Sequence, residues 1–425
     1  MNKYEQHKKV ALPWLEEIPE HWELVKINIL FEERREKVSD KDFEALSVTK
    51  MGVTKQLANV AKTIAGDNRK KVLKDDFVIN SRSDRKGSSG VSNFDGSVSL
   101  INTVLKIRNG NVRFIHYLMR SVPFQEEFYK HGKGIVADLW STNFQSMKNI
   151  LLPIPSLYEQ AQIADYLDWK ISEIDRLIAL EKEKIEKLNR LFEKIISFNS
   201  SNMKEESIRK YVDIVRGNST FTKDDLLSKG TYVALQYGKV YKVDTIDNNY
   251  NFYVNDEFYK SSQIVDRNDI IAVYTSETIE DLGHFAFYDR DEKGLIGGEQ
   301  LLIKPKEGID PKYLFYCLKK DALLLKKAST GIKVYRFKSN DLKSIKIPVV
   351  SLNEQKKIVE RIEKKLSKVK RNIDICNSII GELNSFKYSL ISEVVIGKID
   401  VRSVVIPSYE KVDVDISTDE EEIEE

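Results

Sequence analysis

Basic side chains gather on a glycine- and serine-rich loop, S-R-S-D-R-K-G-S-S-G, that directly follows the apolar run at residues 77–80. Arg82, Arg85 and Lys86 on such a loop can pair with phosphates or with the acceptor edge of guanine. Ser88 adds a hydroxyl to the same candidate site. The composition is equally typical of a solvated basic turn, and only the placement of the loop can decide between the two interpretations.

Two further segments combine small residues with a cation and an aromatic side chain. They are H-G-K-G-I-V-A-D-L-W at residues 131–140 and A-S-T-G-I-K-V-Y-R-F at residues 328–337. Small residues let a backbone approach a ligand closely, and neighbouring cations and rings can then contact it. The candidate binding residues here are Lys133, Trp140, Lys333, Tyr335 and Arg336. Trp140 and Tyr335 could equally belong to a core, where large aromatic side chains are usually found.

The second half of the chain carries a counterpart of the basic loop, displaced by 193 residues. At residues 274–283 it reads Y-T-S-E-T-I-E-D-L-G, in which Thr275 is a candidate and acidic residues replace the cations. An acid can accept a hydrogen bond from cytosine but is repelled by phosphate, so this loop reads a different base or recognition lies elsewhere. In the same half, Gln236 is of the type that reads adenine, and Lys239 lies close to it in the sequence.

Motifs for catalysis are missing from the sequence. It has no G-x-x-x-x-G-K-[ST] loop for nucleotide triphosphates, no Pro-Pro pair of the kind with which amino-methyltransferases hold a base, and no G-x-S-x-G turn. Its two cysteines and five histidines lack the spacing of metal ligands. Asp291, Glu292 and Lys293 resemble part of a nuclease site, but such triplets arise often by chance in a highly charged chain. We expect a binding protein without catalytic, cofactor-binding or metal-binding residues.

The elements that must position these loops are two copies of one helical template. The first copy opens P-I-P-S-L-Y-E-Q-A-Q-I at Pro153, and the second opens P-V-V-S-L-N-E-Q-K-K-I at Pro348, 195 residues later. In each copy, a serine followed three residues later by a glutamate predicts a capping box at the start of a helix. The chain is therefore an internal duplication.

Both copies continue as long amphipathic helices in the same register. From Ala164 to Ile195, nine of the ten a and d positions of a heptad are apolar or alanine, and the positions 195 residues later keep the pattern except at Cys376 and Lys387. Such a seam over five heptads is typical of a coiled coil. Two copies in one chain most simply pair about a pseudo-two-fold axis, which predicts an antiparallel, intramolecular coiled coil.

Two globular segments accompany the helices. Each is rich in short β-type runs, at residues 77–80, 98–107, 231–237 and 269–274, and each holds a shorter helix candidate, at residues 114–121 and 312–319. The predicted fold class is α+β, with two mixed α/β modules separated by two long helices. The predicted boundaries are 1–152 and 200–346 for the modules, 153–199 and 347–397 for the helical spacers, and 398–425 for an acidic, disordered tail.

The charge distribution is uneven although the net charge is only +2. Residues 412–425 hold eight acidic and no basic side chains, which leaves 68 basic and 58 acidic residues, a net +10, for the rest. A basic body is compatible with a polyanionic partner such as DNA. The start of the chain lacks an apolar signal core, no apolar run reaches transmembrane length, and two cysteines imply no disulfide framework. We therefore expect a soluble, cytoplasmic protein.

These features together resemble the DNA-specificity subunit of type I restriction–modification systems. The resemblance covers nearly the whole chain and includes I-P-E-H-W-E-L-V-K-I at residues 18–27, two divergent modules, and two helices that open with S-L-x-E-Q. It implies two target-recognition domains, each of which reads one half of a split double-stranded DNA sequence. The coiled coil would fix the spacer between the halves and dock methyltransferase (modification) subunits.

In that family the methyltransferase subunits bind S-adenosylmethionine and methylate adenine, while restriction/translocase subunits cut the DNA. The resemblance therefore implies no cofactor in this chain and S-adenosylmethionine in its partners. Two other interpretations remain open. One is the recognition half of an enzyme whose catalytic domains usually share its chain, against which the missing motifs count, and the other is a non-DNA coiled-coil scaffold. The acidic tail after Val401 has no place in the family pattern.

Overall fold

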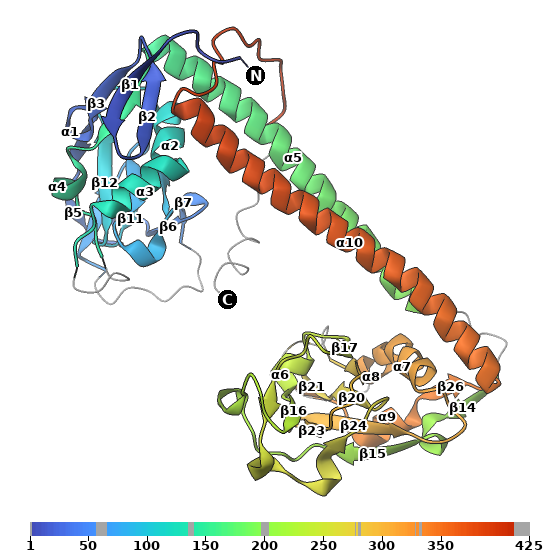
Figure 1. Cartoon of the computed structure of the whole chain (residues 1–425). Helices are drawn as coiled ribbons and strands as arrows, with labels where there is room; N and C mark the ends of the chain where they lie inside the picture. The colour runs from blue at the N-terminus through green and yellow to red at the C-terminus, as the bar shows by residue number, and fades with distance from the viewer. Residues whose placement is uncertain are drawn as a thin grey trace. The chain divides into compact units, whose positions relative to one another are not determined.

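The computed structural model describes residues 2–56, 66–134, 140–196, 204–276, 278, 282–327, 329–330 and 334–411 (Figure 1). The chain divides into unit 1, which comprises Met1–Lys182 and Asn377–Glu425, and unit 2, which comprises Glu183–Cys376. Each unit contains one mixed α/β module and part of both long helices, α5 (Leu157–Ile196) and α10 (Leu352–Val395). Among the described residues, no helix is both long enough and apolar enough to span a membrane.

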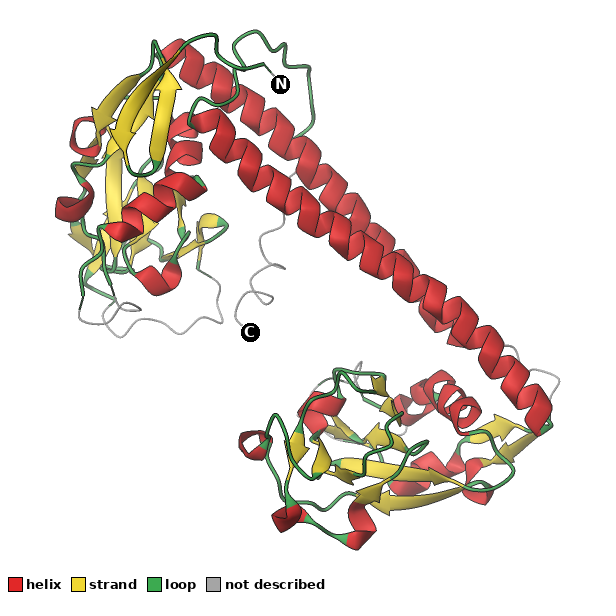
Figure 2. Cartoon of the chain, viewed as in Figure 1, coloured by secondary structure: helices red, strands yellow, loops and turns green. Residues whose placement is uncertain are grey.

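The module of unit 1 is built on a four-stranded antiparallel sheet (Figure 2). Its strand order is β10-β9-β12-β4, with bounds Ser89–Val91, Phe77–Asn80, Asn102–Ile107 and Phe31–Glu33. A second sheet has the order β11 (Gly96–Val98), β8 (Arg69–Val72) and β5 (Lys37–Val38). The other elements are β1 (His7–Leu12), β2 (Leu15–Pro19), β3 (Glu23–Lys26), α1 (Ile27–Leu30), β6 (Leu46–Thr49), β7 (Gly52–Lys55), α2 (Val112–Arg120), α3 (Val122–Lys130), α4 (Phe144–Met147) and β13 (Leu151–Ile154).

The module of unit 2 is built on a five-stranded sheet of order β15-β24-β20-β22-β17. The bounds of these strands are Val212–Arg216, Gln300–Pro305, Ile270–Val273, His284–Tyr288 and Thr245–Ile246. A second sheet has the order β18 (Tyr253–Val254), β16 (Tyr232–Leu235), β23 (Gly294–Ile296) and β19 (Ile264–Val265). The other elements are β14 (Glu205–Ser207), α6 (Tyr237–Val240), β21 (Thr275–Ser276), α7 (Pro311–Lys320), α8 (Ala322–Lys327), β25 (Tyr335–Arg336), α9 (Ser339–Ser344) and β26 (Lys346–Pro348).

The two modules repeat one topology. The strand order β4-β12-β9-β10 in unit 1 matches β15-β24-β20-β22 in unit 2. In both sheets the first of these four strands along the chain pairs with the last, and the second and third follow. Strands expected within 77–80, 231–237 and 269–274, and the two shorter helices, are confirmed. The expected strand at 98–107 instead splits into β11 and β12. A turn separates them because the backbone N–H of Asn102 donates to the Ser99 carbonyl at 3.0 Å.

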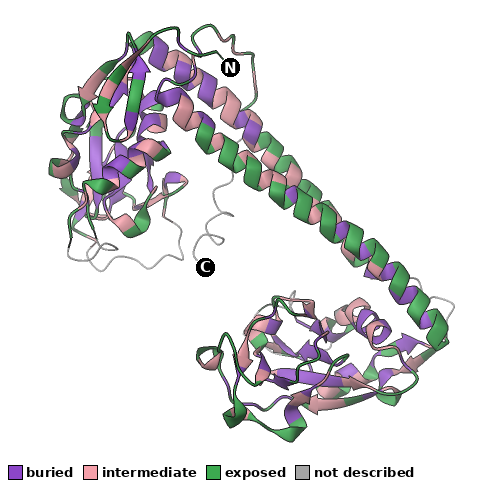
Figure 3. Ribbon diagram, in the orientation of Figure 1, coloured by how far each residue is buried: buried purple, intermediate pink, exposed green. Residues whose placement is uncertain are grey.

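Each module buries its own apolar core, to which the first turns of a long helix contribute (Figure 3). In unit 1, Phe114 of α2 and Ile163 of α5 belong to one buried cluster. In unit 2, Tyr313 of α7 and Ile358 of α10 hold the corresponding places. The start of each long helix is thus part of the core of its own module, which fixes the direction in which the helix leaves it.

Within each unit, α5 and α10 run side by side in opposite directions. In unit 1 the start of α5 shares a hydrophobic cluster with the end of α10, as at Leu167 and Val394. In unit 2 the end of α5 shares one with the start of α10, as at Ile196 and Ile362. Burial follows the predicted heptad register, since Val359, Ile362, Leu366, Val369, Leu390 and Val394 are all buried. The antiparallel pairing of the two helices is confirmed.

The predicted capping boxes are half-formed. The hydroxyls of Ser156 and Ser351 each accept a hydrogen bond from the backbone N–H three residues later, at 3.3 Å. The carboxylate of Glu159, however, accepts from the Tyr4 hydroxyl at 2.7 Å and from the Trp22 indole at 3.0 Å, because the N-terminal segment packs over the start of α5. The equivalent Glu354 is exposed.

Part of the segment predicted to be a disordered tail is packed on unit 1. The side-chain amide of Gln162 donates to the carbonyls of Val401 and Val404, at 3.1 and 2.8 Å, and Val401 is fully buried. The prediction is therefore wrong for residues 398–411, of which Ile399, Val401, Val404 and Ile406 join the cluster around α5. The acidic residues from 412 onward lie outside the described residues.

Candidate nucleic-acid interface

Two basic segments that are far apart in the sequence of unit 1 meet in one small backbone ladder. Ser141 forms antiparallel bridges with both Arg82 and Lys133. Its N–H and carbonyl exchange hydrogen bonds of 3.1 Å with Lys133, and the N–H of Ser83 donates to the carbonyl of Trp140 at 2.9 Å. We call residues 81–83, 133 and 140–142 the unit 1 ladder. It gathers three of the predicted binding residues in one place.

The cations and the ring of the unit 1 ladder reach solvent, whereas Ser81 and Thr142 are buried. Lys133 is exposed, and the side chain of Arg82 is partly exposed and lies 3.2 Å from the carboxylate of Asp84. Trp140 is 38% exposed, so it is not the core residue that a large aromatic usually is. Two cations and a ring on an exposed ladder have the residue types that contact phosphates and base edges.

The rest of the basic loop surrounds this ladder. Arg85 is exposed, and its carbonyl accepts a hydrogen bond from the Tyr129 hydroxyl at 3.3 Å. Burial raises the pKa of Tyr129 to about 12, so the phenol stays a donor that holds the loop. Lys86 is exposed and pairs with Glu126. Ser88 is buried and its N–H donates to the Arg85 carbonyl, so its place is beneath the loop surface.

Unit 2 contains the same ladder with different side chains. Thr275 pairs with Arg336 in the ladder of β21 and β25, and Arg336 also bridges Thr330. The backbone groups of Arg336 and Thr330 exchange hydrogen bonds of 2.9 and 3.0 Å. We call residues 274–276, 330 and 335–337 the unit 2 ladder. Thr275 is buried, Tyr335 is partly buried against the core, and Arg336 is exposed. The predicted residue Lys333 lies outside the described residues.

The two ladders place their cations on different strands. In unit 1 the middle position is Ser141 and its two neighbours are the cations Arg82 and Lys133. In unit 2 the middle position is the cation Arg336 and both neighbours are threonines. The backbone is therefore constant and the exposed chemistry varies, which is the pattern expected when loops on a fixed frame carry recognition.

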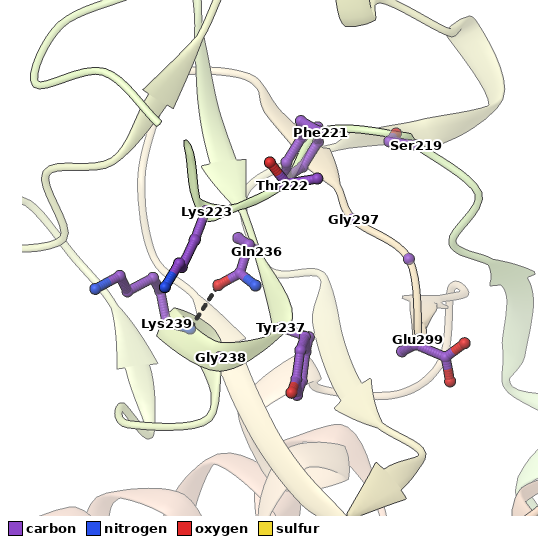
Figure 4. A pocket seen from close by; sticks show the side chains of 11 residues that line it. Ser219, Phe221, Thr222, Lys223, Gln236, Tyr237, Gly238, Lys239, Gly297 and Glu299 are labelled. Carbon is purple, nitrogen blue, oxygen red and sulfur yellow. Dashed lines mark hydrogen bonds between the residues drawn. The ribbon is translucent and has the colours of Figure 1, made fainter. Parts of the chain in front are cut away.

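Gln236 and Lys239 line a hollow of about 530 Å³ in unit 2 (Figure 4). Gln236 caps α6, because its side-chain oxygen accepts from the backbone N–H of Lys239 at 3.1 Å. The ammonium group of Lys239 lies 4.9 Å from the ring centre of Phe252. The hollow also holds Lys223, Tyr237 and Glu299, which sequence reasoning missed. The only signal for Glu299 was the preceding pair of glycines, which marks a turn before a strand.

The hollow and the unit 2 ladder are neighbours. The carbonyl of Glu299 accepts from the N–H of Tyr274 at 3.4 Å, and its carboxylate lies 3.7 Å from the guanidinium of Arg336. Four predicted residues of unit 2, Gln236, Lys239, Thr275 and Arg336, thus belong to one continuous region. In the part of the chain that the structure describes, no group of three or more His, Cys, Asp or Glu side chains is arranged to hold a metal ion.

Comparison with known proteins gives a family match over most of the chain. The model of the type I restriction modification DNA specificity domain matches twice, at residues 19–190 and 201–385. The type I restriction enzyme MjaVIII specificity subunit of Methanocaldococcus jannaschii is 26% identical over 351 residues, which cover 75% of this chain and 78% of that protein. A provisionally assigned MjaX specificity subunit of the same organism is 25% identical over 442 residues, covering 94% and 98%.

Two solved structures share the fold. One, from work on complex assembly and conformational transition of the type I R-M system, has a TM-score of 0.66 at 14% identity and covers 90% of this chain and 99% of that chain. The other, the HsdS subunit from Thermoanaerobacter tengcongensis, has a TM-score of 0.50 at 15% identity, covering 90% and 98%. The duplicated modules, the paired helices and the family match together define a DNA-specificity protein. The chain belongs to the family of type I restriction–modification specificity subunits.

Proposed function

We propose that each module reads one half of a bipartite duplex DNA target, and that α5 and α10 fix the spacer between the two halves. The observation that carries this proposal is the pair of equivalent ladders. Arg82 and Lys133 surround Ser141 in one module, whereas Thr275 and Thr330 surround Arg336 in the other. One backbone with two sets of side chains is suited to reading two different sequences.

The exposed cations divide between two tasks. An arginine can make two parallel hydrogen bonds to the acceptor edge of guanine, which gives Arg82 and Arg336 the chemistry for base reading. Lysines act more as point charges, so Lys133 and Lys239 suit phosphate contacts that set the register on the duplex. The exposed ring of Trp140 adds an apolar surface beside them.

The paired helices offer a docking surface for methyltransferase subunits. In unit 1, Leu177 and Leu180 are exposed and lie three residues apart, on one face of α5. Large apolar side chains that gather on a surface usually mark a protein interface. S-adenosylmethionine and the methylation chemistry would then belong to those partners, restriction/translocase subunits would join the complex, and this chain would recognise DNA without catalysis.

A salt series tests the proposal. The full chain, alone and co-expressed with its methyltransferase subunits, is titrated against random-sequence duplex DNA at increasing salt. The affinity should fall steeply with salt, and the double variant Arg82→Ala, Lys133→Ala should show a shallower dependence. Lys26→Ala provides the control, because Lys26 is exposed on β3, which pairs with β13 and not with the unit 1 ladder in the described residues. Absence of DNA binding in both preparations would overturn the proposal.

A further inference from the structure

Glu299 places a partly exposed carboxylate at the edge of the hollow of unit 2, where its side chain is 43% exposed. It follows Gly297 and Gly298 and adopts a left-handed conformation, with φ of 57°. Its carbonyl is tied to the ladder through Tyr274. Among the described residues, its Oε2 atom has no hydrogen-bond partner, but it forms a long ion pair of 3.7 Å with the guanidinium of Arg336. A partly exposed carboxylate that is held only by a long ion pair keeps acceptor capacity, so it can accept a hydrogen bond from a ligand.

A second polar group in the same hollow is also unsatisfied. The hydroxyl of Ser219 is buried, the residue is only 7% exposed, and this oxygen has no hydrogen-bond partner within the described ranges. Ser219 and Glu299 both line the hollow, and the side chains of Lys223 and Lys239 lie in its wall (Figure 4). The residues that line the hollow therefore combine acceptors with cations, which fits a ligand that carries both amino donors and phosphates.

We propose that Glu299 reads a cytosine of the second half-site by accepting a hydrogen bond from its N4 amino group. This inference rests on the proposed function. Cytosine presents a lone amino donor in the major groove, which a carboxylate can take. Adenine is disfavoured at Glu299, because the N6 amino donor of adenine lies beside the N7 acceptor, which repels a carboxylate.

The equivalent backbone position in unit 1 supports a reading role for this site. There the N–H of Ser81 donates to the carbonyl of Ile101 at 3.2 Å. In unit 2 the N–H of Tyr274 donates in the same way to the carbonyl of Glu299. Ile101 directly precedes β12, as Glu299 precedes β24, and its side chain is 43% exposed. An exposed isoleucine at this place suits contact with the methyl group of thymine. One backbone position thus distinguishes the two half-sites.

The test uses the full chain co-expressed with its methyltransferase subunits and duplexes that carry the wild-type target with one base pair of the second half-site changed at a time. Wild-type protein should lose about tenfold or more in affinity when the cytosine is replaced. Glu299→Ala removes the acceptor, so it should reduce that loss to about threefold or less and leave the profile of the first half-site unchanged. Glu307→Ala, in an exposed turn of unit 2, should keep the wild-type profile.

A DNA-side version needs no protein variant. Replacing the cytosine with a pyrimidine analogue that lacks the N4 amino group should weaken wild-type binding as much as a base change does. The cytosine assignment is overturned if the analogue binds normally, if the Glu299→Ala profile equals that of the wild type, or if the base affected is not cytosine. A wild-type complex without any sequence dependence would overturn the proposed function as well, so the two failures are distinguishable.

Discussion

The side-chain oxygen of Gln160 accepts a hydrogen bond from the backbone N–H of Asn111 at 2.7 Å. Asn111 caps α2, and Gln160 lies in the first turn of α5, so this contact joins the long helix to its module. Gln355 repeats the contact with Asp310, the cap of α7, also at 2.7 Å. The glutamine of the duplicated S-L-x-E-Q motif is therefore the residue that ties each helix to its module.

Gln160→Ala should lower the free energy of unfolding of unit 1 by about 1–3 kcal/mol, because it leaves a partly buried backbone N–H without its acceptor. Chemical denaturation of the full chain measures the change. Gln145→Ala, at an exposed position of α4, should stay within about 0.5 kcal/mol of the wild type. Equal effects of the two substitutions would show that the hydrogen bond between Asn111 and Gln160 does not contribute to the free energy of unfolding.

Lys387 is a charged residue at a heptad position of α10 that faces the seam, and it forms an ion pair with Asp175 of α5. The two groups lie 2.6 Å apart and both side chains are largely buried. Lys387→Leu should destabilise unit 1 by about 2–4 kcal/mol, because the carboxylate of Asp175 loses its partner. Adding Asp175→Ala should recover most of that loss, since an apolar seam needs no ion pair. A double variant that is as unstable as the summed single variants would contradict this account.

The stability of unit 1 should depend on His116 below neutral pH. Burial, aided by the nearby positive charge of Arg120, lowers the pKa of His116 from 6.5 to about 3. Between these two pH values His116 binds a proton in the unfolded chain but not in the folded one. The free energy of unfolding is therefore highest above pH 6.5 and falls as the pH drops toward 3. Between pH 7 and 5 the loss should be about 1–2 kcal/mol.

His116→Asn should flatten this pH dependence, because asparagine can still accept the hydrogen bond that the N–H of Val91 donates to the ring at 3.2 Å. Thermal unfolding at a series of pH values measures the effect. His131→Asn, at an exposed position of the same module, serves as the matched control. If it flattened the profile as much as His116→Asn does, His116 would not be the source.

Lengthening the helices should lengthen the DNA spacer. A seven-residue insertion in α5 between Ile178 and Leu188, matched by one in α10 between Ile373 and Leu383, preserves both heptad registers. Seven residues add about 10 Å of helix, the length of about three base pairs. Sequencing of methylated bases should show the same two half-sequences with a spacer longer by up to about three pairs. An unchanged spacer would count against the helices as its determinant.

Local periodicity explains what the sequence could predict. The helix pairing follows from the seam that runs through Ala164 and Val359, because a heptad repeat is set by neighbours along the chain. The serine caps and most strands are local in the same sense. The shift of 193 residues that relates Arg82 to Thr275 also proved structurally meaningful, since both occupy the same place in their ladders.

Long-range contacts account for what the sequence did not show. Nothing near Arg82 in the sequence indicates that Ser141 will lie beside it, because the ladder forms only when the module closes. The spacing of Ser156 and Glu159 predicts a capping box, but the carboxylate of Glu159 instead accepts hydrogen bonds from Tyr4 and Trp22, which are distant in the sequence. The apolar residues around Val401 were concealed by the acidic run that follows them, so a packed segment was assigned to a disordered tail.

The most direct test of two-module reading is methylated-base sequencing of a host that carries the complete system with wild-type, Arg82→Ala or Arg336→Ala protein. The account predicts a target of two short sequences with a constant spacer. Arg82→Ala should relax bases in one half only, and Arg336→Ala bases in the other half only, with the spacer unchanged. A single contiguous target, or substitutions that each alter both halves, would contradict it.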